Sequence, residues 1–473
     1  MMTAALRIQE TLGLQRWLAR ALLAAALLGG VVVVAMAVRN GQIERLALVS
    51  AFGLAVLFCL RWPLVPLFVF VALIPIEFIG FVGDLGTLSR YAGILFAVVY
   101  GVPRLGRLTL RAVPLPGWLF FGWALVSITW ALDPNVAATA LGTLVQMFVI
   151  MILVADVVVH QPLLVRPLLW SYSVSAAITG VIGVEAYLTG ASSTGRVSAF
   201  ATQDVAQFAA ILLPALVVSL FELLRGRLIP ISAAIAAITT TGIVVSGTRG
   251  AWLSAVVVLA LFVIPRLKPV ARIAAVGVIA LLLVVSYQLP GVADLVSRRT
   301  ATAITTGGAG RTDIWNVGLT IIQSSPIIGV GYGNFPVAFT PEMIAESDVG
   351  AYLANDESAR GPHSIVFGSF AELGLVGFIP LALFLLPFVL RRGWGPEGGV
   401  VQAALVSLLV SSLFLDILNR KQLWLIVGMA AGLAFLAARR REIAPVPIPH
   451  ASGPARRLRR IEGPAAPGRA ASS

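Results

Sequence analysis

The feature of this chain that most limits its fold is a succession of long apolar runs. Hydrophobic residues make up 59% of the 473 residues and charged residues only 12%, whereas about a quarter of a soluble domain is charged. So little charge cannot cover a soluble surface, which excludes a soluble enzyme and a DNA-binding factor. Because helices satisfy their own backbone polar groups in lipid, the sequence predicts an all-α polytopic integral membrane protein.

The apolar runs are long enough to count as membrane segments. A hydrocarbon core of about 30 Å requires roughly 20 apolar residues per helix, and on this criterion we expect about 12–14 transmembrane helices. The short segments can instead be re-entrant or interfacial pieces. The first segment follows three arginines and resembles a signal peptide, but we expect a retained helix because many further segments follow it. The segments lie near residues 20–38, 45–60, 63–82, 88–102, 117–132, 139–159, 165–188, 203–224, 229–247, 251–265, 271–288, 363–390, 399–418 and 422–438.

The formal net charge of +13 is unevenly distributed between the two predicted sides. If the N-terminus is cytoplasmic and every segment crosses, 23 of the 34 Lys and Arg residues lie on the cytoplasmic side, as the positive-inside rule requires. Both termini are then cytoplasmic and the longest loop is outside. The predicted parts are a helical bundle over 1–288, a long outer loop over 289–362, C-terminal transmembrane helices over 363–438, and a basic disordered cytoplasmic tail over 439–473.

The outer loop contains two recognisable local patterns. From Arg311, the spacing of Trp315, Leu319 and Ile322 predicts a short amphipathic helix that lies at the membrane interface, anchored by Trp315. The glycine-rich stretch 329–335 resembles a dinucleotide fingerprint, but no strand precedes it and no βαβ unit is present. We interpret it as a flexible turn rather than a nucleotide site.

Titratable and cationic residues on the outer side are the candidate catalytic groups. Among the three histidines only His363 is expected there, which makes it the natural general base, although a helix-capping or interfacial role stays open. Arg249, in a tight turn, and Arg196 and Arg311, each after a glycine, could bind a diphosphate through planar bidentate guanidinium groups. They could equally be topological or lipid-headgroup arginines.

The acidic residues and the cysteine give weaker indications. Seven acids lie in or at the ends of apolar segments, and the spacing of the sequence shows no Lys or Arg partners for them. Glu372 follows His363 by nine residues, about 180° around a helix, so we do not expect the two to share a site. There is no Asp-x-Asp motif and one cysteine, so no metal site is predicted. The seven acids are Glu77, Asp156, Glu185, Asp204, Glu222, Glu372 and Asp416.

The order of these motifs resembles the bacterial O-antigen ligase superfamily over roughly residues 190–390. The residues that carry the resemblance are Gly195-Arg196 with Phe200, Gln203-Asp204, Ser246-Gly-Thr-Arg249-Gly-Ala, Gly310-Arg311 with Trp315, Pro326 with Gly329-Val-Gly331 and Phe335, and His363 with Glu372-Leu-Gly374-Leu-Val-Gly377. This superfamily includes lipopolysaccharide O-antigen ligases, Wzy-type polymerases and O-linked oligosaccharyltransferases. Many members carry Asn where this chain has Asp204.

The resemblance implies a GT-C-like glycosyltransferase at the periplasmic face of the bacterial inner membrane. Its donor would be a polysaccharide on undecaprenyl diphosphate and its acceptor a sugar hydroxyl of lipid A–core, with inversion at the anomeric centre. It implies no cofactor, metal, nucleotide sugar or nucleic acid. The implied catalytic residues are His363, Arg249 and Arg311. Donor binding is implied for Arg196, Arg249, Arg311, Arg360, Trp315, Gln203 and Asp204.

Two alternatives remain open from the sequence. The first is a polymerase or a protein O-oligosaccharyltransferase of the same superfamily, because acceptor choice depends on loop shape. The second is a secondary transporter or lipid flippase, which predicts paired repeats and a charged site at the bilayer midplane. The sequence shows no convincing inverted repeat.

Overall fold

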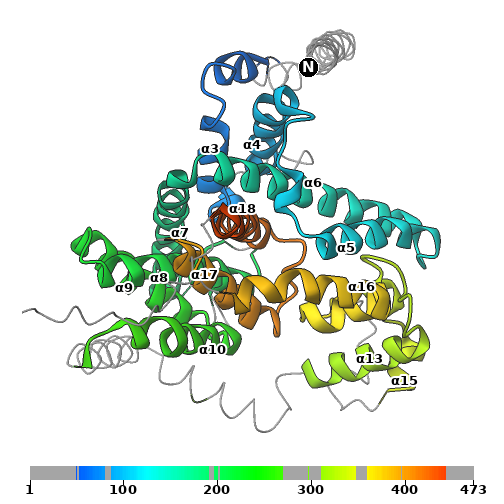
Figure 1. The fold of residues 1–473 in the computed structure, drawn as a ribbon. Coiled ribbons are helices and arrows are strands. Elements are labelled where there is room, and N and C mark those ends of the chain that lie inside the picture. Colours follow the sequence, from blue (N-terminus) through cyan, green and yellow to red (C-terminus); the bar gives the residue numbers. More distant parts are fainter. Residues whose placement is uncertain are drawn as a thin grey trace, which may run out of the picture.

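The structure is a computed structural model that describes residues 50, 53–79, 87–190, 197–200, 203–269, 297, 311–347, 360–391, 393–395 and 397–443. Over these residues the regular elements are helices, as predicted (Figure 1). The α-helices are α3 (Val65–Leu73), α4 (Leu88–Phe96), α5 (Leu115–Val126), α6 (Pro134–His160), α7 (Val165–Leu188), α8 (Val205–Leu224), α9 (Ile229–Val245), α10 (Arg249–Val258), α13 (Arg311–Ser324), α14 (Phe335–Ala338), α15 (Pro341–Ala345), α16 (Ile365–Leu390), α17 (Gly398–Ser412) and α18 (Lys421–Ile443).

Six helical segments of the described residues are long and apolar enough to cross a membrane. They comprise α6, α7, α8, α16 and α18, and the continuous helix from Arg249 to Arg266 that starts with α10. The prediction of an all-α polytopic membrane protein is therefore confirmed. The predicted segments 20–38 and 271–288 lie outside the described residues, so the total of about 12–14 spans remains a prediction, as do the four predicted parts of the chain.

Helix α18 runs through the middle of the bundle, against α6, α16 and α17 (Figure 1). Its residues from Leu423 to Ala431 are almost entirely buried, on all sides of the helix. At Gly428 and Gly432, an added Cβ would lie 2.8 Å from backbone carbonyl oxygens of α6. Glycines four residues apart therefore allow α6 and α18 to pack at close range, the pattern common between membrane helices.

Helix α16 is broken inside the membrane segment, at Gly374, which has a φ of 62° and a ψ of −170°. The loop before α14 supplies the hydrogen bonds that the break removes. The amides of Val330 and Gly331 donate to the carbonyls of Ala371 and Glu372, at 3.0 and 2.9 Å. On the other side of the break, the amide of Leu375 donates to the carbonyl of Pro326. Two segments separated in sequence thus hold each other in a fixed geometry.

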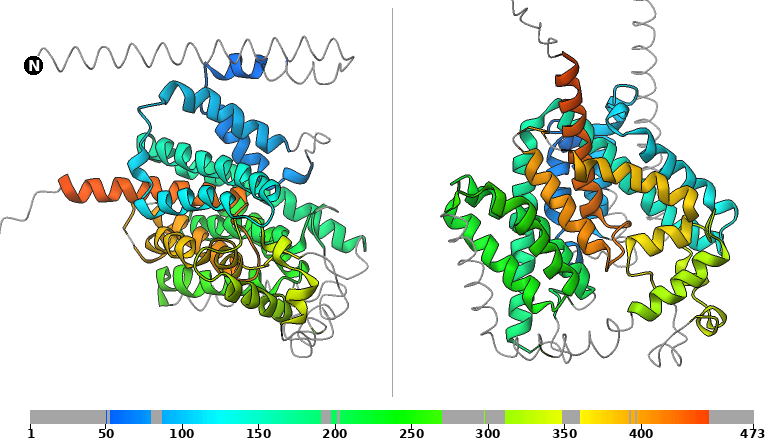
Figure 2. Two further views of the ribbon diagram at one scale, coloured as in Figure 1. Left: turned by 90° about the vertical axis from the view of Figure 1, so that its right-hand side faces the viewer. Right: turned by 60° about the horizontal axis from the view of Figure 1, so that its bottom comes forward.

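The outer loop has a hydrophobic core of its own, separate from the main core. Residues of α13, α14, α15 and the first turns of α16 form it, including Ile314, Val317, Phe335 and Ala371. In Figure 2, α13 and α15 lie at the margin of the bundle beside α16. Helix α13 is confirmed, and its side packed on the protein, with Ile314, Val317 and Ile321, differs from the predicted apolar face. Leu319 of that predicted face is 46% exposed, and its location at the membrane interface stays a prediction.

Two of the seven acids, Glu222 and Glu77, have Arg or Lys partners that the local spacing of the sequence does not reveal. Glu222 of α8 bonds the guanidinium groups of Arg166, with 3.1 Å from Nε to Oε1, and of Arg225, at 3.0 Å. Arg225 also pairs with Glu397. At the other end of the bundle, Glu77 pairs with Lys421. These partners lie between 3 and 344 positions apart, so folding rather than helical spacing brings most of them together.

Replacing Gly374 with alanine is expected to destabilise the protein by more than about 2 kcal/mol. A Cβ there would overlap the carbonyl of Ile327, and the positive φ is costly for any residue with a side chain. Gly122→Ala in α5 is the matched control, since nothing lies within 4 Å of its added Cβ. Thermal unfolding of the two purified variants measures the difference. Equal melting temperatures would contradict the described role of the break.

Candidate active site

Four helices begin close together at one end of the bundle: α8, α10, α13 and α16. The Asp204 carboxylate caps α8 by accepting from the amides of Ala206 and Gln207, at 2.8 and 3.0 Å. The Thr248 hydroxyl, just before α10, donates to the carbonyl of Val205 at 3.4 Å. Because helix N-termini carry partial positive charge and unbonded amides, this end of the bundle favours anions.

His363 lies at the start of α16, where four charged or titratable groups act on one another. Burial lowers the pKa of the His363 imidazole from its ordinary value of 6.5. The positive charges of Arg311 and Arg360 lower it further, and the carboxylate of Asp204 opposes them. Three predicted site residues from different parts of the chain therefore lie near enough to His363 for their charges to act on its imidazole.

The backbone of His363 is in the left-handed region, with a φ of 45°. Residues other than glycine adopt this conformation uncommonly, although Asn, Asp and His do so more than others. Ser364 then returns to an extended conformation and precedes the first residue of α16. The strained turn gives the half-buried imidazole a fixed position ahead of the helix, and such backbone strain is concentrated at functional sites.

Arg249 is the first residue of α10, and it is half-buried. The predicted tight turn before it is confirmed: Gly247 has a φ of 61°, and the amide of Thr248 donates to the Ser246 hydroxyl at 3.2 Å. Within the described residues, no hydrogen bond or ion pair is found for the guanidinium of Arg249. A partly buried permanent cation at a helix N-terminus, with no counter-charge in this part of the structure, is well suited to bind an anion.

An aromatic group lies between these helices. The ring of Trp315 stacks on Phe367 of α16, with 5.2 Å between centroids and 14° between planes, and lies 6.1 Å from Phe414. Phe414 packs on Gly250, where an added Cβ would be 3.0 Å from its ring. Trp315 thus packs on neighbouring helices of the protein, and its predicted role as an interfacial anchor of α13 stays a prediction. The aromatic residues link α13, α16 and α10.

Predicted site residues with buried polar atoms that lack a hydrogen-bond partner among the described residues include Trp315, at its indole nitrogen, and Gln203, at its side-chain amide. Gln203 is the more buried of these two. The side chain is 4% exposed, and neither its amide oxygen nor its amide nitrogen has a hydrogen bond. A buried amide left unpaired costs about 1–3 kcal/mol, so it is expected to have a partner when the site is occupied. Gln203 directly precedes the α8 cap, Asp204.

Most of the predicted site residues are therefore brought together, with one outside the described residues. Arg311 and Arg360 join His363 and Asp204, while Arg249, Trp315 and Gln203 border the same helix starts. Arg196 lies outside the described residues. The Glu372 carboxylate accepts from the amide of Phe335 at 3.2 Å, so it is directed at the loop. This agrees with the helical spacing, which predicted that Glu372 and His363 do not share a site.

The interpretation of the stretch 329–335 as a flexible turn is wrong. Val330, Tyr332 and Phe335 are buried, and the Tyr332 hydroxyl donates to Asn419 at 2.6 Å. Its three glycines have positive φ, and an added Cβ at Gly331 would lie 2.6 Å from Ala131. Glycine is needed there for a turn conformation and close packing, not for mobility.

Sequence reasoning missed the groups that position these residues. Phe367 and Phe414 enclose Trp315, and Thr248 joins α10 to α8. The residues just before each outer helix carry a usable signal, because Thr248 and Ser364 are residue types that favour the N-cap. Among the described residues, no group of three or more His, Cys, Asp or Glu side chains could hold a metal ion.

The fold and this site define a class: an all-helical, multi-pass membrane protein with arginines and one histidine gathered where several helices begin. Residues 233–382 match the family model described as O-antigen ligase. This part of the chain is therefore similar to the O-antigen ligase family, and the resemblance to the O-antigen ligase superfamily predicted from the sequence is confirmed. The matched range includes Arg249, Arg311, Trp315, Arg360 and His363. It starts within α9, so α8 and its cap Asp204 lie before it. A comparison with curated proteins returns no match.

Proposed function

We propose that the protein is an inverting, metal-independent O-antigen ligase. It transfers a polysaccharide from undecaprenyl diphosphate to a sugar hydroxyl of lipid A–core, at the periplasmic face of the inner membrane. The observation that carries the proposal is the cluster formed by His363, Arg311, Arg360 and Asp204, whose charges act on the imidazole, within the range similar to the O-antigen ligase family and its neighbouring helix. A base can take the proton of an attacking hydroxyl, and permanent cations beside it can stabilise the anion that the reaction releases.

The leaving group of this reaction is a lipid diphosphate, which gains negative charge as the glycosidic bond breaks. Arg249, Arg311 and Arg360, with the starts of α8, α10, α13 and α16, stabilise that charge, and Arg196 is proposed to contribute. Fixed donors and dipoles in a site that excludes water are effective because they need no reorganisation during the reaction. The donor's lipid tail lies along the apolar helices, and the loop carrying α13 to α15 covers the sugars.

The acceptor hydroxyl must lose a proton, and the neutral imidazole of His363 takes it. Gln203 and Trp315 contact the donor sugar in this proposal, because the buried amide of Gln203 is without a hydrogen bond among the described residues. Asp204 caps α8, a role that asparagine also performs. The Asn of many family members would thus preserve the cap while removing the charge.

The dependence of transfer on pH is expected to follow His363. Only the neutral imidazole accepts a proton, so kcat/KM should rise with pH through an inflection below 6.5, the direction in which the pKa of His363 is shifted. Arg311→Gln removes a charge that lowers this pKa, so its residual activity should inflect at a higher pH. Asp204→Asn removes the opposing charge and should move the inflection lower. Shifts in the same direction for both variants would contradict the assignment.

The side of the membrane is supported by the distribution of arginines in the structure. The end opposite the site carries Arg166, Arg225 and Arg266 beside the last residues of α8 and α10, and Arg440 and Arg441 near the end of α18. Such an excess is characteristic of the cytoplasmic side. The site end is then periplasmic, where lipid A–core is available as the acceptor.

The lipopolysaccharide of a strain lacking this protein tests the function. A ligase predicts core without long chains, with lipid-linked polymer accumulating. Core that bears a single repeat unit would instead assign a polymerase, the alternative within the superfamily, and an unchanged profile would leave a protein O-oligosaccharyltransferase to be tested on glycoproteins. Transfer by purified protein in vesicles, from lipid-linked polymer to lipid A–core, separates catalysis from transport by a flippase or secondary transporter.

A further inference from the structure

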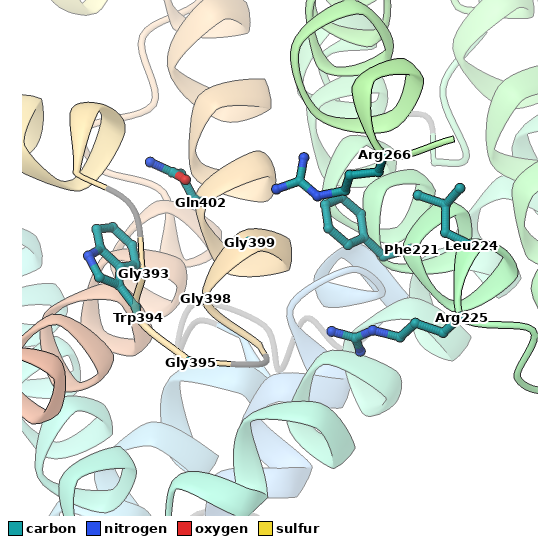
Figure 3. A pocket seen from close by; sticks show the side chains of 10 residues that line it. All are labelled: Phe221, Leu224, Arg225, Arg266, Gly393, Trp394, Gly395, Gly398, Gly399 and Gln402. Atoms are coloured by element: carbon teal, nitrogen blue, oxygen red, sulfur yellow. The ribbon is translucent and has the colours of Figure 1, made fainter. Parts of the chain in front are cut away.

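A cavity of about 410 Å³ lies at the end of the bundle opposite His363, between α8, α17 and the segment before α17. Figure 3 shows the guanidinium groups of Arg225 and Arg266 directed toward the glycine turn that starts α17. Phe221 and Leu224 form the apolar wall, and Trp394 lies on the far side. The two cations and the apolar groups of α8 thus lie on the same side of the cavity and face the glycines at the start of α17.

The positions of both arginines are fixed by their surroundings. Arg266 lies over the ring of Phe221, with 5.1 Å from its Cζ to the ring centroid, and its Nη1 donates to the carbonyl of Phe262 at 2.5 Å. Arg225 bonds Glu222 at 3.0 Å and Glu397 at 2.9 Å. Held guanidinium groups lose little conformational freedom when they bind a ligand, which favours a preformed site.

Glycines at the start of α17 allow the guanidinium of Arg266 to lie close to the helix backbone at the cavity wall. Its first two residues are Gly398 and Gly399, and an added Cβ at Gly399 would lie 3.2 Å from Nη2 of Arg266. Side chains larger than glycine would therefore occupy the space in front of the guanidinium. The positive end of the α17 dipole adds to the charge of Arg225 and Arg266.

A second cavity, of about 720 Å³, shares the wall formed by Gly393, Trp394 and Gly395. Four more arginines line it, together with leucines of α18 and the start of α7. Across the two cavities, six arginines face two carboxylates, Glu222 and Glu397, counted over the described residues that line or contact them. The six are Arg166, Arg225, Arg227, Arg266, Arg440 and Arg441.

We propose that the cavity between Arg225, Arg266 and the start of α17 binds the phosphate group of an anionic phospholipid from the cytoplasmic leaflet. A guanidinium matches phosphate oxygens in geometry and charge, and the apolar walls suit the lipid's glycerol and first methylenes. Basic pockets between helices on this side of a membrane bind such headgroups in general. The site is remote from the proposed transfer reaction and is independent of it.

Binding is tested by the thermal stability of the purified full-length protein in vesicles of phosphatidylcholine, with and without phosphatidylglycerol. A ligand that binds only the folded protein raises its melting temperature. Phosphatidylglycerol should raise the melting temperature of the wild type, and Arg266→Gln should weaken the apparent affinity about 10- to 100-fold, the effect of losing one charged hydrogen bond. Gly399→Leu fills the space without changing charge and should abolish the shift.

Arg107→Gln is the matched control, since Arg107 is exposed, lies on the same predicted side and lines neither cavity. It should respond to phosphatidylglycerol as the wild type does. Equal melting temperatures in phosphatidylcholine alone show that a variant is folded, and Gly399→Leu decides the question if Arg266→Gln does not fold. Equal responses of Gly399→Leu and Arg107→Gln would overturn the proposal. Stabilisation by inorganic phosphate alone, at the same concentration and lost in Gly399→Leu, would overturn the lipid as the source of the phosphate.

Discussion

Arg249→Gln is expected to reduce polysaccharide transfer by about 10²–10³-fold, the usual effect of removing one group that stabilises transition-state charge. The guanidinium is half-buried at the first residue of α10 and has no counter-charge among the described residues, so its charge is available to a substrate. Glutamine keeps a hydrogen-bond donor of similar length but removes the permanent charge. The loss should therefore fall mainly on kcat, where the diphosphate gains charge.

Transfer from lipid-linked polymer to lipid A–core, measured with purified protein in vesicles, gives the rates. Arg90→Gln is the matched control, because Arg90 is an exposed arginine of α4 that the charge distribution of the sequence places on the same side. Membrane insertion and the melting temperature should be the same for both variants. Wild-type transfer by Arg249→Gln would remove this arginine from the mechanism, and equal losses in both variants would indicate a general effect of outer charge.

His363→Asn is expected to reduce transfer by about 10²–10⁴-fold, the contribution of a positioned general base. Asparagine is the informative replacement because it tolerates left-handed backbone, and His363 has a φ of 45°. The backbone turn ahead of α16 is then retained while the proton acceptor is lost. A fall in activity with an unchanged melting temperature would separate the chemical role from a structural one.

The residual activity of His363→Asn should no longer inflect below pH 6.5, since the group that produces the inflection is absent. His160→Asn is the control. That imidazole belongs to the last residue of α6, where it bonds the carbonyl of Asp156 at 2.8 Å. An inflection that persists in His363→Asn would assign the general base to another residue. Retention of full activity would leave His363 with only the helix-capping or interfacial role that the sequence also allows.

Local sequence signals predicted a large part of the fold. The apolar runs gave α6, α7, α8 and α16 nearly at their observed bounds, because twenty consecutive apolar residues have few other solutions in a membrane protein. The turn before Arg249 and the helix that starts at Arg311 were also predicted from adjacent residues. What these features share is that a few neighbouring residues determine them.

Features that depend on distant segments could not be predicted. Glu77 meets Lys421 across 344 positions, and the true buried face of α13 is set by α16 rather than by its own periodicity. The glycine-rich composition of 329–333 is typical of a mobile turn. The segment is nevertheless fixed, because its amides donate to the carbonyls of α16 that the break at Gly374 leaves without helical partners. The charge distribution of the sequence could only assign the candidate site residues to one predicted side of the membrane, because their mutual arrangement comes from tertiary structure.

The break in α16 has a mechanical consequence. The first turns of α16 contact the core of α13 to α15 through Ala371, and they also contribute Ile365 and Leu373 to the main core, in which the second half of α16 packs. Because the loop from Pro326 to Gly331 is hydrogen-bonded on both sides of the break, bending of the bundle, for example in a bilayer of different thickness, would move the break and the loop together as one rigid unit. The arrangement of charges around His363 should thus be insulated from strain at the opposite end of the bundle. Lipid occupancy there should change the melting temperature while leaving the pH inflection of transfer in place.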